Sequence, residues 1–108
     1  MTKKIAVPAT LAAVAASAAF ALPSGAATTV KVDDDVFSPK TVTVKSGTTV
    51  KWRWVGDDPH NVTVTKGPVK FHSGTQRKGS YSKKLRRGGT YKIVCTIHPG
   101  MAMTLKVR

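Results

Sequence analysis

The sequence predicts an all-β protein, a sandwich or barrel of about seven to eight short strands, and its composition is the first reason. Twelve of the 26 apolar residues beyond residue 27 are valines, whereas the same stretch contains one alanine, two leucines and no glutamate. Valine favours strands, and the strong helix formers among the apolar and acidic residues are nearly missing. Helix is therefore disfavoured throughout this part of the chain.

Two patterns along the chain support the same fold. Apolar residues alternate with polar ones at a period of two, as in strands with one buried and one solvated face. Turn-forming glycine and proline residues separate these runs. Short antiparallel strands at this spacing form a sandwich or a barrel, although the topology between Val64 and Tyr81 is left open. The alternating runs fall at residues 30–32, 42–44, 50–54, 62–64, 81–85, 91–95 and 103–107.

The first 27 residues have the layout of a secretory signal peptide. Two lysines precede an alanine-rich apolar run over residues 5–22, and small residues follow it. Cleavage is expected after Ala26 or Ala27, with Ala21 as the earlier alternative, and an uncleaved anchor is the competing interpretation. The chain is thus expected to comprise a signal peptide over residues 1–27 and one domain over 28–108. That domain would be exported to the periplasm or the cell exterior.

The length and the cysteine count limit what the chain can be. Its 108 residues allow one domain, and two dozen apolar side chains make a small core. The single cysteine, Cys95, rules out an intrachain disulfide, so a bound metal or ligand would help to stabilise such a fold. A large multidomain enzyme is excluded.

Residues with metal-binding chemistry gather towards the C-terminal end of the sequence. A thiol, an imidazole and a thioether follow one another at Cys95, His98 and Met103. A second imidazole, His60, lies between a turn and an alternating strand, and strand parity places it on the buried face with the core valines. Thiolate, neutral imidazole and thioether suit copper that cycles between two oxidation states, whereas hard ions require carboxylates.

The spacing of these residues resembles that of the small blue copper proteins, or cupredoxins, of the plastocyanin and pseudoazurin type. The similar patterns are Cys95-x-x-His98-x-x-x-x-Met103 and Asp58-Pro59-His60-Asn61-Val62, with Phe37-Ser38-Pro39 and Gly89-Thr90-Tyr91 as further signposts. The resemblance covers essentially all of residues 28–108. It implies a Greek-key β-sandwich that binds one copper ion in a type 1 site. Only 35 positions separate His60 from Cys95, so the segment between them is expected to be shorter than in plastocyanin.

The resemblance also implies a role for each site residue. His60, Cys95 and His98 would bind copper in one plane, with Met103 as the long axial ligand. Asn61 would hold the copper-binding loops together and point its backbone N–H at the cysteine sulfur. His98 would be the partly exposed ligand through which electrons pass. Its small apolar surroundings would be Pro99, Gly100, Met101 and Ala102.

Other residues of the same types are interpreted as structural. Met101 is the competing thioether, and we assign it to the patch or the core because Met103 matches the family position. His72 is interpreted as a surface loop histidine, and strand parity makes Trp52 and Trp54 core residues. The aspartates at 33–35 form a solvated turn to which we assign no catalytic role.

The net charge of the chain indicates which kinds of binding partner it favours. Without the two leader lysines, 16 basic residues oppose five aspartates, a net charge of +11. Such a field favours acidic redox partner proteins, docking near His98, Pro99 and Met101, or an anionic membrane surface. Nucleic acid ranks lower because the leader exports the chain and the positive residues fall mainly on outward strand positions. The domain is expected to be a monomer.

Three functions are compatible with this sequence. The first is a one-electron carrier that is not an enzyme. The second is a copper-binding protein for delivery, storage or scavenging, and the third is an extracellular β-sandwich module without metal. Copper loading distinguishes them: an intense blue colour with reversible reduction indicates the first, colourless retention of Cu(I) the second, and no uptake the third.

Overall fold

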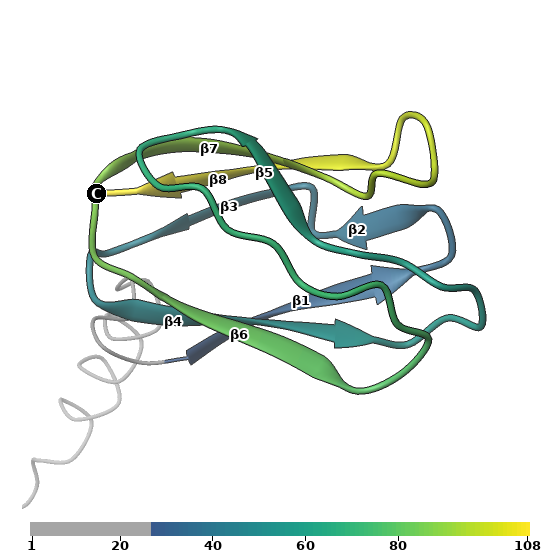
Figure 1. Cartoon of the computed structure of the whole chain (residues 1–108). Helices are drawn as coiled ribbons and strands as arrows, with labels where there is room; N and C mark the ends of the chain where they lie inside the picture. Colours follow the sequence, from purple (N-terminus) through teal and green to yellow (C-terminus); the bar gives the residue numbers. More distant parts are fainter. Residues whose placement is uncertain (1–26) are drawn as a thin grey trace, which may run out of the picture.

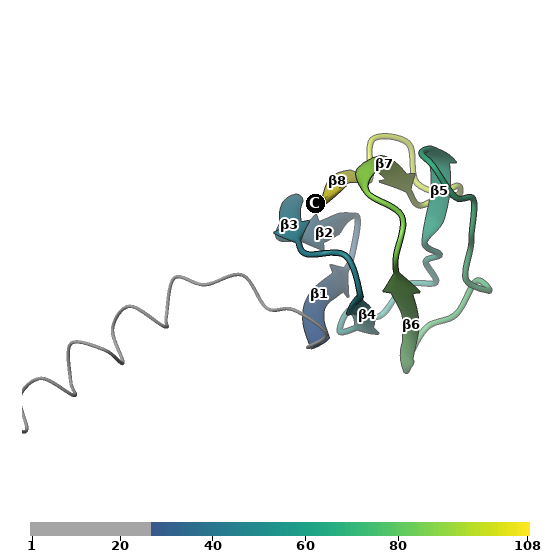
Figure 2. The same ribbon diagram turned by 90° about the vertical axis from the view of Figure 1, so that its left-hand side faces the viewer.

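The computed structural model describes residues 27–108, which form two β-sheets packed face to face (Figures 1 and 2). The predicted all-β sandwich is confirmed. Within the described residues there is no helix, and so none that could cross a membrane. The signal peptide lies outside these residues except for its last position, and it stays a prediction. The eight strands are β1 (Ala27–Asp33), β2 (Val36–Ser38), β3 (Thr41–Val44), β4 (Thr48–Trp54), β5 (Thr63–Lys66), β6 (Ser80–Leu85), β7 (Gly89–Val94) and β8 (Ala102–Val107).

The sequence predicted antiparallel strands, but two of the strand pairs are parallel, and the strand order explains why. One sheet has the order β2-β1-β4-β6 and the other β3-β8-β7-β5. The pairs β1–β4 and β3–β8 are parallel. Figure 1 shows that β2 and β3 run in the same direction although they belong to different sheets. Because the chain changes sheet there without reversing, β4 returns in the direction of β1.

The core lies between the two sheets and follows the predicted alternation. In β4, Val50, Trp52 and Trp54 are buried while Lys51 and Arg53 are exposed. The ring of Trp52 lies 6.0 Å, between centroids, from the rings of Phe71 and Tyr81. The prediction that both tryptophans are core residues is therefore confirmed.

Residues 71–79 lie along the segment that leads into β5. The Ser73 N–H donates to the Val62 carbonyl at 2.8 Å, and His60 and Gln76 exchange two backbone hydrogen bonds of 3.0 Å. The stretch between β5 and β6 therefore carries the chain from the second sheet to the first while flanking His60. This settles the part of the topology that the sequence left open.

Three connections meet at one end of the sandwich, opposite the C-terminus (Figure 1). They are the β1–β2 hairpin around residues 33–36, the segment 55–60 after β4 and the β7–β8 loop at 95–101. We call this end the distal end. It brings together residues that are far apart in the sequence.

Candidate metal centre

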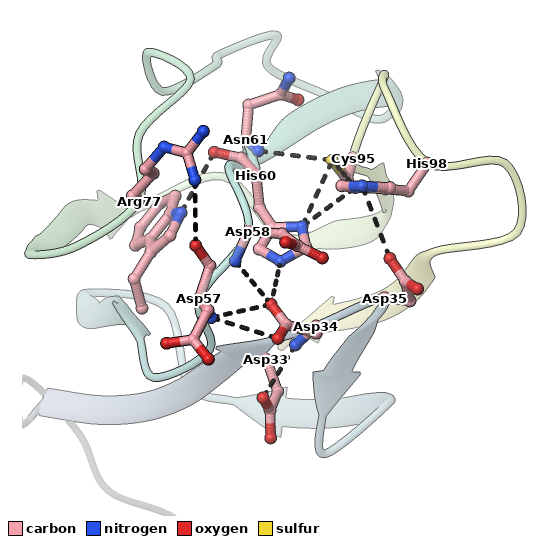
Figure 3. A network of polar contacts seen from close by, with 11 residues as sticks. Asp33, Asp34, Asp35, Asp57, Asp58, His60, Asn61, Arg77, Cys95 and His98 are labelled. Atoms are coloured by element: carbon pink, nitrogen blue, oxygen red, sulfur yellow. Dashed lines mark hydrogen bonds and ion pairs between the residues drawn. The ribbon is translucent and has the colours of Figure 1, made fainter.

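Three donor atoms converge at the distal end (Figure 3). The Nδ1 atoms of His60 and His98 lie 3.1 Å apart. The Cys95 Sγ lies 3.5 Å from His98 Nδ1 and 4.0 Å from His60 Nδ1. Nitrogen and sulfur ligands of a transition metal such as zinc sit about 2.0–2.1 Å and about 2.3 Å from the ion. Two nitrogens can thus share an ion up to about 4.2 Å apart, and a nitrogen and a sulfur up to about 4.4 Å. All three separations fall within these limits, so the donors fit one ion.

His60 is held from several sides before any metal is considered. Its backbone pairs with Gln76, and its carbonyl accepts a 3.1 Å hydrogen bond from the indole nitrogen of Trp54. The side chain is fully buried, as strand parity predicted. The imidazole therefore enters the site with little freedom to turn.

The β7–β8 loop supplies the other two donors. It closes tightly, because the Cys95 N–H donates to the Met101 carbonyl at 3.0 Å and the Met101 N–H to the His98 carbonyl at 3.1 Å. Gly100 has φ +85°, a conformation that glycine adopts without strain. Cys95 is buried, whereas the His98 side chain is 26% exposed. His98 is thus the donor that reaches the surface.

Asn61 joins the two halves of the site, as the family resemblance implied. Its backbone N–H lies 3.5 Å from the Cys95 sulfur. Its side-chain amide donates to Thr96 at 2.8 Å and to Thr75 at 3.1 Å, and its carbonyl oxygen accepts from the Thr96 N–H at 3.1 Å and the Thr63 hydroxyl at 2.8 Å. The His60 segment and the cysteine loop are consequently fastened to each other by one residue.

The two buried methionines stand in different places. Met103 pairs with Ile93 in the β7–β8 ladder, and its sulfur accepts a 3.4 Å hydrogen bond from the indole nitrogen of Trp52 in the core. Met101 stands one pleat closer to the distal end, directly opposite Cys95. Side chains of directly opposed residues lie on the same face with Cβ atoms about 4.5–5.5 Å apart. This register favours Met101 over the predicted Met103 as a neighbour of the three donors.

Asp34 is a site residue that the sequence interpretation missed. Its carboxylate lies 3.2 Å from Nε2 of His60 and accepts hydrogen bonds from the backbone N–H groups of Asp57 and Asp58 (Figure 3). The Asp58 and Asp57 amides, followed by His60, hold the pKa of Asp34 below its ordinary value of 3.8. It is therefore a carboxylate at neutral pH. No spacing rule links it to His60, 26 positions away, because the β1–β2 hairpin creates the contact.

The other side chains of this region that could bind a metal, those of Asp35, Asp58 and His72, lie on the surface. In the described part of the chain, exposed Asp35 and Asp58 form a second group with His98, whose Nε2 is 3.5 Å from the Asp35 carboxylate. His72 belongs to neither group; it is exposed, and its Nδ1 lies 3.1 Å from the Ser73 carbonyl oxygen. This agrees with its interpretation as a loop histidine.

The acidic residues gather at the distal end of the molecule. All five acidic residues of the sequence lie at the distal end, Asp33 as the last residue of β1 and the others in the connections at 34–35 and 57–58, where Arg77 also donates to the Asp57 carbonyl. At the opposite end, Ser46 hydrogen-bonds to the carbonyls of Arg86 and Arg108, which brings the β3–β4 turn, the β6–β7 turn and the C-terminal strand together. The surface around His98 is therefore more acidic than the net charge suggests.

Comparison with known proteins decides the family. Residues 25–108, more than three quarters of the chain, match the family described as copper binding proteins, plastocyanin/azurin family. The chain belongs to this family. Copper is the ion that this family binds, and the donor atoms of His60, Cys95 and His98 lie close enough together to hold it.

Individual members of the plastocyanin/azurin family are similar over most of the domain. The chain is 37% identical over 97 residues to amicyanin-alpha of Methylorubrum extorquens, covering 86% of this chain and 81% of that protein. It is 33% identical over 89 residues to plastocyanin of Scenedesmus fuscus, covering 69% of this chain and 91% of that protein.

Solved structures give the same result. A reduced tryptophan-to-tyrosine variant of amicyanin superposes with a TM-score of 0.69 at 28% identity, over 76% of this chain and 82% of the other. A purple cupredoxin from Nitrosopumilus maritimus has a TM-score of 0.68 at 20% identity, over 75% of this chain and 99% of the other, and shares the fold. A copper-containing nitrite reductase of Thermus scotoductus matches with a TM-score of 0.69 at 26% identity, over 75% of this chain but only 22% of that one.

Proposed function

We propose that the chain is an exported type 1 copper protein that carries single electrons between partner proteins. The observation that carries this proposal is the convergence of His60, Cys95 and His98 at one end of a closed sandwich, with two donors buried and the third at the surface. A buried metal protected from solvent, with one ligand edge open to a partner, suits electron transfer rather than substrate binding.

The ligand set we propose is His60, Cys95 and His98 with Met101 as the axial thioether, in place of the expected Met103. The position of Met101 opposite Cys95 supports this choice, and so does the hydrogen bond that Trp52 makes to the Met103 sulfur. The soft sulfur donors and neutral imidazoles fit the donor set of a blue copper site.

Copper bound by these residues would supply one-electron chemistry by alternating between its two oxidation states. The protein would contribute a fixed coordination geometry. Asn61 fastens the two ligand segments together. The backbone hydrogen bonds between Cys95, His98 and Met101 restrict the conformation of the β7–β8 loop. A site that moves little on reduction exchanges electrons with little reorganisation.

Delivery, storage or scavenging of copper is the alternative function. A delivery protein must release its ion readily, which favours exposed and mobile donors. The full burial of His60 and the near-complete burial of Cys95 instead support retention. We also propose that the chain is not an enzyme, because its similarity to nitrite reductase covers about a fifth of that protein and carries no activity over to this chain.

Export and docking complete the proposal. The leader over residues 1–27 supports a periplasmic or extracellular location. The docking surface we propose consists of His98 with the exposed Ile97 and Pro99, since Met101 is buried and cannot contribute as expected. The acidic partner predicted from the net charge is not retained for this surface, because the aspartates of the distal end would repel it at close range.

The experiment that tests the proposed function loads the protein with copper and cycles it electrochemically in the presence of a strong Cu(I) chelator. An electron carrier gives a reversible one-electron wave and keeps its copper over many cycles. Transfer of the copper to the chelator on first reduction would contradict the carrier function and favour delivery.

A further inference from the structure

We propose that Asp34 is a positioning residue of the metal centre, which fixes the ring orientation and the tautomer of His60 through a carboxylate–imidazole hydrogen bond. This inference rests on the proposed function and deepens it by assigning a residue that lies outside the ligand set. It gives the β1–β2 hairpin a part in the copper site.

The geometry places Asp34 behind the ligand. Nδ1 of His60 faces Cys95 and His98, while Nε2 on the other side of the same ring lies 3.2 Å from the Asp34 Oδ1. A neutral imidazole has one donor and one acceptor nitrogen. If Nε2–H donates to the carboxylate, Nδ1 keeps its lone pair for the metal. The hydrogen bond therefore selects the tautomer that can bind.

The carboxylate is itself held in place. Its Oδ1 accepts the Asp57 N–H at 3.0 Å and the Asp58 N–H at 2.9 Å, so two backbone groups fix it independently of His60. Gly56 leaves the space that the carboxylate occupies, since a Cβ there would lie 2.7 Å from the Asp34 Cγ and from its backbone nitrogen. The segment before His60 and the hairpin are thus shaped around this side chain.

Two consequences follow for a bound metal. Partners that orient a metal-binding histidine typically contribute 10- to 100-fold in metal affinity. A negative charge behind His60 also stabilises the more positive, oxidised ion over the reduced one. Asp34 is therefore expected to strengthen copper binding and to lower the reduction potential of the site.

The test compares Asp34→Ala and Asp34→Asn with Asp57→Asn as a matched control. Asp57→Asn removes one charge from the same end, but Asp57 contributes only its backbone to the network. We expect Asp34→Ala to weaken copper binding by about 10- to 100-fold. Asp34→Asn keeps an acceptor for Nε2–H, so it should retain more copper affinity than Asp34→Ala. Its reduction potential should be higher than that of Asp57→Asn. Affinity and potential equal to those of Asp57→Asn in both Asp34 variants would overturn the proposal.

A measurement on the parent protein keeps the proposal testable if the variants fold poorly. Nitrogen-15 NMR of the metal-free chain at pH 8 should find the His60 proton on Nε2, exchanging with water more slowly than the ring proton of exposed His72. A proton on Nδ1, or exchange as fast as that of His72, would overturn the inference. A parent that takes up no copper would instead contradict the proposed function, and the NMR result would still decide the role of Asp34.

Discussion

Cys95 and Met101 face each other across the last rung of the β7–β8 hairpin, where the Cys95 N–H donates to the Met101 carbonyl at 3.0 Å. The preceding rungs pair Val94 with Ala102 and Ile93 with Met103. This register distinguishes the two methionines more sharply than their spacing in the sequence does.

Substitution of each methionine by leucine tests that assignment. Met101→Leu should change the visible and EPR spectra of the copper-loaded protein and raise its reduction potential, because the oxidised ion loses a sulfur donor. Met103→Leu should leave the spectra unchanged and lower the free energy of unfolding by less than about 1.5 kcal/mol, since the volume is conserved and one hydrogen bond from Trp52 is lost. The reverse pattern would restore Met103 as the axial ligand.

Gly56→Ala tests the space around Asp34. The added methyl would overlap the Asp34 side chain and backbone, so we expect a loss of about 1–3 kcal/mol in the free energy of unfolding, measured with urea on the metal-free chain. Gly74→Ala is the control, because a Cβ there meets nothing within 4 Å and its φ is not positive. Equal stability of the two variants would show that Asp34 is not packed as described.

Asn61→Ala tests the link between the ligand segments. The substitution removes four side-chain hydrogen bonds and leaves the Thr96 N–H without its acceptor. We expect a loss of about 1–3 kcal/mol in stability and faster release of copper. Thr75→Ala removes one of these hydrogen bonds at an exposed position, so it should lower the free energy of unfolding by less than half as much as Asn61→Ala does. An Asn61→Ala variant with unchanged stability and unchanged copper release would contradict a rigid link between the two ligand segments.

Tyr91 predicts how stability falls at alkaline pH. Burial raises the pKa of its phenol above the ordinary value of 10.0, against an opposing effect of Arg87, and its hydroxyl donates to the Arg87 carbonyl at 2.8 Å. The folded chain therefore holds this proton more tightly than the unfolded chain does. Its contribution to stability is complete below pH 10 and is lost as the pH rises through the folded-state pKa.

Urea unfolding of the parent and of Tyr91→Phe between pH 7 and pH 11 measures this effect. At pH 7 the variant should be less stable by about 0.5–1.5 kcal/mol, the value of one hydrogen bond. Above pH 10 the difference should narrow, because only the parent has a phenol at this position, and its ionisation stabilises the unfolded state. A difference that stays constant over the whole range would contradict the raised pKa.

The sequence was sufficient for the parts of the site that local chemistry dictates. Period-two alternation defined the strands, and the cysteine with its neighbouring histidine, together with His60 after a turn, indicated a soft-metal site. These signals lie within short segments, where residue type and strand parity decide which face a side chain occupies.

What the sequence could not supply depends on pairing between distant segments. Met103 lies in the C-terminal strand and Met101 directly precedes it, and both are buried, so parity alone does not choose between them; the hairpin register does. Asp34 resembled any polar turn residue until the hairpin brought it beside His60. Likewise, the parallel pairing of β1 with β4 follows from a change of sheet between β2 and β3 that no local pattern marks.

The most direct test of the central claim is the visible absorption spectrum of the copper-loaded protein beside that of Cys95→Ser. If His60, Cys95 and His98 share one copper ion, the parent should show an intense blue sulfur-to-copper band, and the variant should lose it completely. A colourless parent, or a variant as blue as the parent, would contradict the account.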